Sequence, residues 1–230
     1  METESNKFLV PLAIVVAGAL VSGAIYFGDS TPSTSSGRTT DNANTDIDIA
    51  PVSNKDHIRG ASSARFFVIE YSDTECPFCK TFHGTMKEVL RTYGNDVAWV
   101  YRHFPIEQLH AKAIKESEAT ECAAEQGGNQ AFWTYTDKVF ERTNSNDSLP
   151  ESELPKIAAD IGLNVGQFNS CLSSGKYAEA VKKSVEAAVK AGARGTPYSV
   201  IVDQEGEVKN IINGAEPLAN VKAKLDALLK

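Results

Sequence analysis

The sequence has no cluster of basic residues, although it carries charge throughout. Its 23 lysines and arginines are scattered along 230 residues, and the formal net charge is −7. A nucleic-acid-binding protein needs a concentrated basic surface, so that class of function is excluded. The acidic balance is explained by solubility alone.

Metal-ligating residues are also scarce, with four cysteines and four histidines in the whole chain. Cys76, Cys79 and His83 have a spacing that could supply three zinc ligands. A closed structural zinc site needs four ligands, and the sequence has no second cysteine and histidine group of suitable spacing. We therefore assign no metal to this chain.

Charged residues are absent from residues 8–27, a run of 20 residues. As a helix this run would measure about 30 Å, the thickness of one hydrocarbon core. The apolar run continues past the small residues Gly23 and Ala24, which makes a poor cleavage site. We favour a retained signal anchor over residues 1–28 rather than a cleaved signal peptide, with Lys7 on the cytoplasmic side.

Aromatic residues are absent from residues 29–50, where nine of 22 residues are serine or threonine. Such a composition cannot build a core, so we predict a flexible, disordered linker. The remaining 180 residues, 51–230, suffice for one well-packed domain. We expect this domain to lie outside the cytoplasm, tethered to the cell membrane.

The domain contains the motif Cys76-Pro77-Phe78-Cys79, which follows a strand-like run and opens a helix-like run. A helix start presents unpaired backbone N–H groups that stabilise a thiolate, the form of cysteine that attacks disulfides. A bond between cysteines this close in sequence closes too short a loop to stabilise a fold. The pair is therefore a candidate redox-active dithiol, with a zinc site or an incidental pair as the alternatives.

The rest of the domain predicts one sheet interrupted by helices. The expected strands are residues 66–71, 97–101, 198–202 and 208–212, and the expected flanking helices are 80–93 and 217–229. Between the second and third strands the pattern is helical, with a break at Gly127 and Gly128. Without this helical middle, the order is β-α-β followed by β-β-α, which is an α/β fold.

Five short motifs occur in a characteristic order along this domain. They are Glu70-Tyr71-Ser72-Asp73, Cys76-Pro77-Phe78-Cys79, Tyr101-Arg102-His103-Phe104-Pro105, Glu121-Cys122-Ala123 and Gly195-Thr196-Pro197. With them the chain resembles the DsbA-like thiol–disulfide oxidoreductases over about residues 52–230. The resemblance implies a thioredoxin-like fold with an all-helical lobe inserted at about residues 107–193.

The resemblance also implies individual roles. Cys76 matches the exposed nucleophile that forms a mixed disulfide with a client protein, and Cys79 matches its partner thiol. Pro197 matches the family's cis-proline, which leaves the backbone of Thr196 free to pair with an extended client. A trans proline at a strand start is the alternative. The expected client-binding residues are Thr196, Pro197, Pro77 and Phe78.

Glu70 lies six residues before Cys76, near the end of an otherwise apolar strand. Thioredoxin-like proteins carry an acidic group at this offset, beneath the dithiol. A carboxyl buried there would have a raised pKa and could exchange a proton with Cys79. The alternative is a glutamate at a strand end that points to solvent.

The residues around the motif predict a less oxidising dithiol than in the best-known members, which have a histidine where this chain has Phe78. Asp73 and Glu75 would oppose formation of the thiolate, and Lys80 and His83 would partly offset them. We interpret His83 as a surface histidine.

Cys122 and Cys171 are the remaining cysteines, and they lie 49 positions apart in separate predicted helices. In an exported protein a leftover even pair predicts a disulfide. Several DsbA-like proteins have a second, structural disulfide in this lobe, which agrees with that assignment. Two buried free thiols are the alternative.

We predict a membrane-anchored, extracytoplasmic oxidoreductase that passes its Cys76–Cys79 disulfide to reduced exported proteins. The dithiol carries both electrons, so we expect no cofactor. The resemblance implies reoxidation by a quinone-linked membrane partner of the DsbB or VKOR kind. Two alternatives stay open: a reductase or isomerase fed by a membrane electron donor, and a non-catalytic peptide-binding or chaperone module.

Overall fold

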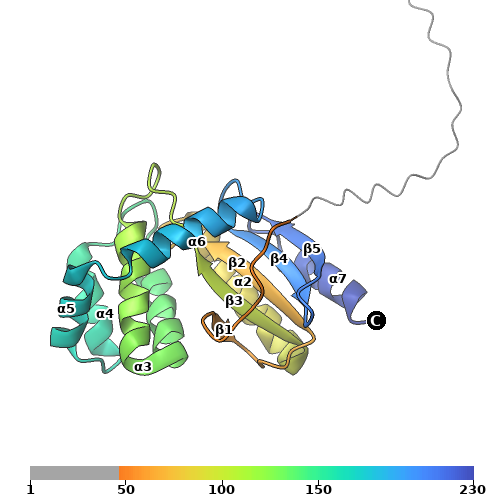
Figure 1. Ribbon diagram of the computed structural model, residues 1–230, viewed down its shortest axis with the longest axis horizontal. Helices are drawn as coiled ribbons and strands as arrows, with labels where there is room; N and C mark the ends of the chain where they lie inside the picture. The colour runs from red at the N-terminus through yellow and green to blue at the C-terminus, as the bar shows by residue number, and fades with distance from the viewer. Residues whose placement is uncertain (1–46) are drawn as a thin grey trace, which may run out of the picture. The chain divides into compact units, whose positions relative to one another are not determined.

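The computed structural model describes residues 47–230 (Figure 1). Its elements are β1 (His57–Arg59), β2 (Phe66–Ser72), α2 (Pro77–Tyr93), η2 (Gly94–Asp96), β3 (Val97–His103), α3 (Ala113–Arg142), η3 (Glu151–Glu153), α4 (Leu154–Asp160), α5 (Val165–Ser174), α6 (Ala178–Lys190), β4 (Tyr198–Asp203), β5 (Val208–Asn213) and α7 (Leu218–Leu228). Within this part of the chain, no helix is long and apolar enough to cross a membrane. The predicted anchor at residues 1–28 lies outside the described residues.

The five strands form one sheet in the order β1-β3-β2-β4-β5. The central pair, β2 and β3, is parallel, and the β2–β4, β4–β5 and β1–β3 pairs are antiparallel. Every residue of β2 is buried because strands flank it on both sides and helices cover both faces. The predicted β-α-β and β-β-α units around one sheet are therefore confirmed.

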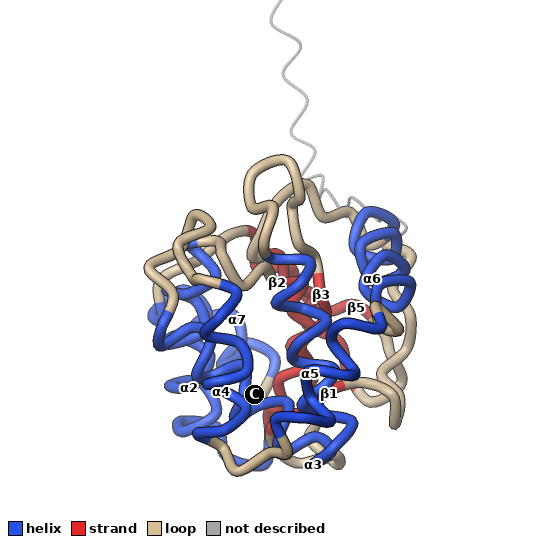
Figure 2. Tube along the Cα trace, turned by 90° about the vertical axis from the view of Figure 1, so that its left-hand side faces the viewer, coloured by secondary structure: helices blue, strands red, loops and turns tan. Residues whose placement is uncertain are grey.

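Helices cover the sheet on both faces. α2 and α7 pack on one face, where Phe82 and Leu225 join a core with the strand residues Val68 and Trp99. α6 crosses the other face, where Ala188 joins a second core. Figure 2 shows the strands between α6 on one side and α2 with α7 on the other. The molecule is thus a three-layer sandwich with the dithiol motif at one end of its central strand.

The inserted lobe is formed by α3, α4 and α5, which enclose a third core. α3 is two helices joined at a kink, since Gly127 and Gly128 have non-helical backbone angles there and Gly128 has a φ of 63°. The predicted break at this pair is thereby confirmed. A disulfide joins Cys122 of α3 to Cys171 of α5.

Two features were not expected from the sequence. The three residues of β1 are too few to show a strand pattern, and they form a strand only by pairing with the edge of β3. Ile47 and Ile49, in the predicted linker, lie partly buried against the core beneath α6. The part of the chain that packs on the domain core therefore begins before Pro51.

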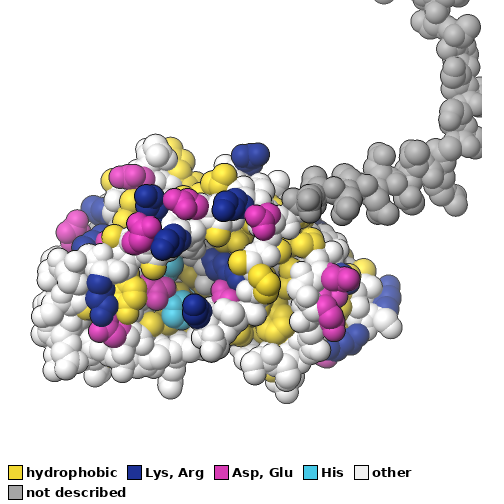
Figure 3. Space-filling view, viewed as in Figure 1, with side chains coloured by type: hydrophobic (Ala, Val, Ile, Leu, Met, Phe, Trp, Pro, Cys, Tyr) yellow, Lys and Arg dark blue, Asp and Glu magenta, His cyan; other side chains and the backbone are white. Residues whose placement is uncertain are grey.

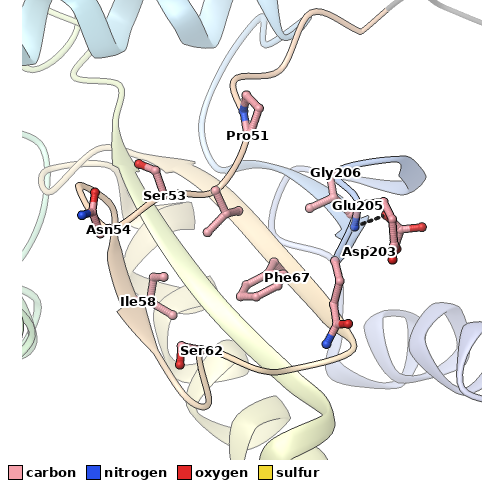
Figure 4. Close-up of a pocket in the computed structure, with 12 residues that line it drawn as sticks. Pro51, Ser53, Asn54, Ile58, Ser62, Phe67, Asp203, Glu205 and Gly206 are labelled. Carbon is pink, nitrogen blue, oxygen red and sulfur yellow. Dashed lines mark hydrogen bonds between the residues drawn. The ribbon is translucent and has the colours of Figure 1, made fainter.

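A hollow of about 460 Å³ lies between the segment that leads into β1 and the turn that joins β4 to β5. Pro51, Phe67 and Asp203 are among its lining residues (Figure 4). Asp203 pairs with Phe66 at the first residue of β2, whereas Cys76 follows the last. This hollow is therefore at the opposite end of the sheet from the dithiol.

Replacing both Cys122 and Cys171 with alanine should destabilise the domain, because the disulfide shortens the unfolded chain by closing a loop of 49 residues. The expected loss is about 4 kcal/mol in the free energy of unfolding, measured with guanidinium chloride. In a strong reductant the difference from wild type should largely disappear, because both chains then lack the crosslink. A loss below about 1 kcal/mol under oxidising conditions would contradict a stabilising role.

Candidate functional site

The dithiol motif lies where β2 passes into α2. Cys76 is the N-cap residue of α2, and Pro77 occupies the first position of the helix. A proline is suited to that position because its missing N–H has no partner in a helix start anyway. The N–H of Lys80 donates to the carbonyl of Cys76 at 3.0 Å, which closes the first turn. Both cysteines are free thiols held on this one turn.

The Cys76 thiol is the acidic one of the pair, with a pKa lowered to about 6. The thiol of Cys79 donates a hydrogen bond to it and is the largest cause, while burial acts in the opposite direction. The side chain of Thr196 and the backbone N–H groups of Cys79 and Phe78 add smaller contributions. The unpaired N–H groups of the helix start thus act as predicted. At neutral pH Cys76 is largely a thiolate.

Cys79 has the opposite character. It is fully buried, and burial together with the thiolate of Cys76 raises its pKa well above the usual value. The backbone N–H of Asp73 donates to its sulfur at 3.4 Å. Cys79 therefore keeps its proton at neutral pH, so the site holds one thiolate and one thiol.

Glu70 is fully buried in β2, near the dithiol. The indole Nε1 of Trp99 donates to its Oε2 at 2.8 Å. Burial is the largest cause that raises the pKa of Glu70 to about 7, against the lowering effects of Ser72 and Trp99. The side chain thus does not point to solvent, and it can both hold and release a proton near neutral pH.

The loop before β4 completes the site from a distant part of the sequence. The peptide bond between Thr196 and Pro197 is cis. The carbonyl oxygen of Thr196 lies 3.4 Å from the sulfur of Cys76, 120 positions away in the chain. Cys76 is only 5% exposed, so it is not the exposed nucleophile that the sequence predicted.

The comparisons with known proteins point to one family. Residues 52–222 match the family model described as thioredoxin. The fold is similar to the crystal structure of DsbA2 from Pseudomonas aeruginosa, with a TM-score of 0.66 and 28% identity over 78% of this chain and 96% of that one. The chain belongs to the thioredoxin family, as a DsbA-like thiol–disulfide oxidoreductase.

Other matches are a second solved structure with the same fold and curated proteins that are named as antiporters. The structure of α-DsbA1 from Wolbachia pipientis has a TM-score of 0.65 at 22% identity, covers 77% of this chain and 92% of that one, and shows the fold alone. A Na⁺/H⁺ antiporter NhaA 1 of Mycolicibacterium gilvum is 37% identical over 115 residues, 50% of this chain. An NhaA antiporter of Herminiimonas arsenicoxydans is 35% identical over 142 residues, 62% of this chain. The chain spans about a fifth of the length of these curated relatives, 18% and 21%.

In the structure of this DsbA-like enzyme, the predicted site residues lie in two groups. Glu70, Cys79, Cys76 and the Thr196-Pro197 loop meet at the end of the central strands. Pro77 and Phe78 lie on the surface beside them. Cys122 and Cys171 lie in the helical lobe, where they form the disulfide described above.

His83 is not the surface residue that the sequence suggested. It is buried one turn after Cys79, and its Nε2 lies 2.6 Å from Oδ1 of Asp137 on α3. Arg59 of β1 binds the same carboxylate through two nitrogens. Spacing along α2 could not reveal this, because the partners come from two other elements.

The acidic residues before Cys76 also differ from expectation, because both are buried. Oδ2 of Asp73 lies 2.9 Å from Nδ1 of His110, and Glu75 accepts a hydrogen bond from Thr143. Burial lowers the pKa of His110, but Asp73 outweighs this effect and the net shift is upward. Sequence reasoning missed His110, whose distance of 37 positions from Asp73 gives no local signal.

Exposed apolar side chains lie close to the motif. Phe78 is 65% exposed and Leu109, in the loop after β3, is 68% exposed. A groove of about 490 Å³ extends along α6 next to that loop, with Phe104, Ile106 and Val185 in its lining. Arg194, two residues before Thr196, lies on its rim. Such apolar patches are typical of surfaces that bind other polypeptides.

Iodoacetamide should label Cys76 with a pH midpoint near 6, because its pKa is lowered to about 6 and only the thiolate reacts. The measurement is the labelling rate of the reduced protein between pH 4 and pH 10, followed by peptide mapping. Cys79 in the same molecule is the internal control and should stay unlabelled below pH 9, since its pKa is raised. A Cys76 midpoint between pH 8 and pH 9 would show an ordinary thiol.

Glu70→Gln should stabilise the domain at high pH. The pKa of Glu70 is higher in the folded state, so its favourable contribution is complete below pH 4.5 and is lost as the pH rises through about 7. Glutamine does not titrate. Between pH 4.5 and pH 8, the unfolding free energy of the variant relative to wild type should therefore rise by about 3 kcal/mol. A difference independent of pH would mean that Glu70 titrates normally.

Proposed function

We propose that the protein is an extracytoplasmic oxidant that passes its Cys76–Cys79 disulfide to cysteine pairs of exported proteins. The observation that carries this proposal is the split between the two thiols, an acidic Cys76 beside a buried, weakly acidic Cys79. A stabilised thiolate favours the reduced form of the enzyme, which makes its disulfide a better oxidant. The family resemblance supports the same activity.

The exchange follows from this geometry in two steps. A client thiolate attacks the sulfur of Cys76, the Cys76–Cys79 bond breaks, and Cys79 leaves with the electron pair. Glu70 supplies the proton that Cys79 then holds. A second client thiolate attacks the client sulfur of the mixed disulfide and releases Cys76 as a thiolate. The client has lost two electrons and the dithiol has gained them.

Client binding needs little side-chain recognition. The backbone of Thr196, next to the cis peptide bond, borders Cys76 and can pair with an extended client segment. Phe78, with Pro77 beside it, and Leu109 provide apolar contacts for unfolded chains of varied sequence. This combination supports a broad range of reduced, exported clients rather than one folded partner.

A location at the membrane completes the proposal. The apolar run at residues 8–27 would hold the domain at the extracytoplasmic surface through the linker. The curated relatives are Na⁺/H⁺ antiporters by name, which supports a membrane setting for this type of domain. Reoxidation would fall to a quinone-linked membrane protein of the DsbB or VKOR kind, in keeping with the family.

Cys79→Ala should accumulate mixed disulfides between Cys76 and its clients in cells, because no partner thiol remains to release them. The adducts are identified by mass spectrometry after trapping with acid. The double variant Cys76→Ala/Cys79→Ala is the matched control and should trap nothing. Equal trapping by both variants would exclude exchange through Cys76.

The same clients report the direction of exchange. Without the protein, clients of an oxidant should accumulate with free thiols. Clients that accumulate instead with mispaired disulfides would overturn the oxidant role in favour of a reductase or isomerase.

A further inference from the structure

Glu70 is buried, so its proton needs a route to solvent if the dithiol exchanges disulfides as proposed. The route inferred below rests on that proposed function. Each cycle moves a proton between Glu70 and Cys79, and both groups are fully buried. Oε2 of Glu70 accepts a hydrogen bond from Trp99, whose indole nitrogen can donate but cannot accept. The remaining oxygen, Oε1, has no hydrogen-bond partner within residues 47–230. Oε1 is therefore the oxygen of Glu70 that is free to take part in a further hydrogen bond.

A row of polar residues crosses the sheet at the level of Glu70. In the register of the sheet, Glu70 is opposite Ser199 of β4 and Tyr101 of β3, and Tyr101 is opposite His57 of β1. Directly paired residues point to the same face. The residues two positions before Glu70 and Tyr101 on that face are Val68 and Trp99. The polar row is thus set into an otherwise apolar core.

Two hydroxyl groups lie beside Glu70 on this face: that of Tyr101, opposite it in the row, and that of Ser72, two positions further along β2. The Ser72 side chain lies next to both Glu70 and Tyr101, because it acts to lower the pKa of Glu70 and also that of Tyr101. Burial is the largest cause that raises the pKa of Tyr101 far above its usual value. Both hydroxyls are buried without a hydrogen-bond partner among the described residues. Each can therefore accept one proton while donating another.

The outer end of the row opens at the edge of the sheet. Two histidines, His57 and His103, each place Nε2 within 3.0 Å of Oε1 of Glu121. These three residues and Tyr101 line a surface hollow of about 300 Å³. Figure 3 shows histidine and acidic side chains gathered in a hollow of this face, below α6. The ring of His103 packs edge-on against that of Tyr101, with 5.5 Å between centroids.

We propose that Ser72 and Tyr101 form a proton-transfer route that connects Glu70 to the surface hollow at His57, His103 and Glu121. A hydroxyl passes a proton on by accepting one and donating another, so neither residue needs to ionise.

The proton balance follows the direction of the exchange. When the Cys76–Cys79 bond is reduced, Cys79 receives both bond electrons and the proton of Glu70. The carboxylate left behind recovers one proton from solvent through Tyr101 and Ser72. When the dithiol is reoxidised, Cys79 returns its proton to Glu70, and the surplus leaves by the same route. Ser72 and Tyr101 end each cycle unchanged.

The test is Tyr101→Phe, which removes one oxygen and keeps the packed ring. The measured step is reduction of the Cys76–Cys79 disulfide by dithiothreitol, and its rate is monitored by stopped-flow tryptophan fluorescence. At pH 8.5 Glu70 is mostly ionised, since its pKa is about 7, and each reaction must draw a proton through the route. The variant should then be slower than wild type by roughly tenfold. At pH 5.5 Glu70 is already protonated, so the two rates should be equal.

Tyr135→Phe is the matched control, because it removes the hydroxyl of another buried tyrosine, in the helical lobe. Its rate should equal that of wild type at both pH values. Ser72→Ala is the second test and should reproduce the effect of Tyr101→Phe without changing the ring. The titratable groups that face Glu70 are Cys76 and Cys79 from α2 and Tyr101 from β3. The pKa values of Cys79 and Tyr101 are raised well above their usual values, so neither group changes its protonation between pH 5.5 and pH 8.5.

A double variant separates a relay from a packing effect. In Glu70→Gln there is no carboxyl to serve, so adding Tyr101→Phe should slow the reaction no further. An equal slowing in both backgrounds, or no slowing of Tyr101→Phe at pH 8.5, would overturn the route while the proposed exchange stands. If the wild-type disulfide neither forms nor reacts with thiols, the proposed function fails, and the route fails with it.

Discussion

The helix start at Cys76 and the buried end of the central strand impose opposite demands on two thiols one turn apart. The Cys79 thiol stabilises negative charge on Cys76, and the backbone N–H groups of the helix start add smaller contributions. Burial disfavours negative charge on Cys79. The chemistry depends on this contrast, because only one sulfur can be the nucleophile while its neighbour keeps a proton. Phe78, which carries no charge, does not prevent it.

The polar residues at this buried end of the sheet lower the stability of the fold. A row of valine and leucine would stabilise the sheet more than Glu70, Ser72 and Tyr101, whose oxygens have few partners within residues 47–230. Polar groups in such a place are expected where a site needs them, because the local rules of core packing fail mainly at functional sites. Within β2 the polar residues occupy the last three positions, Glu70, Tyr71 and Ser72, at the end that leads to the dithiol.

Much of this arrangement could be predicted from the sequence, because its signals are local. The apolar runs of β2 and β3, the helical spacing of α2 and the break at Gly127 each arise from neighbours a few positions apart. The motif itself placed Cys76 at a helix start. The environments of His83 and His110 could not be predicted this way, because their carboxylate partners lie 54 and 37 positions away.

The sequence by itself determined the order of strands and helices from β2 onward and the candidate cysteine pair, since each is marked by residues that are contiguous or evenly spaced. The place of Pro197 opposite the dithiol came from the family resemblance. Only the tertiary structure decided how the Cys76 sulfur is covered by Thr196, where Asp73 and Glu75 point, and which polar residues align with Glu70 across the sheet. The physical reason is strand register. Pairing between distant segments sets which side chains meet, and a shift of one residue would turn the whole polar row to the other face.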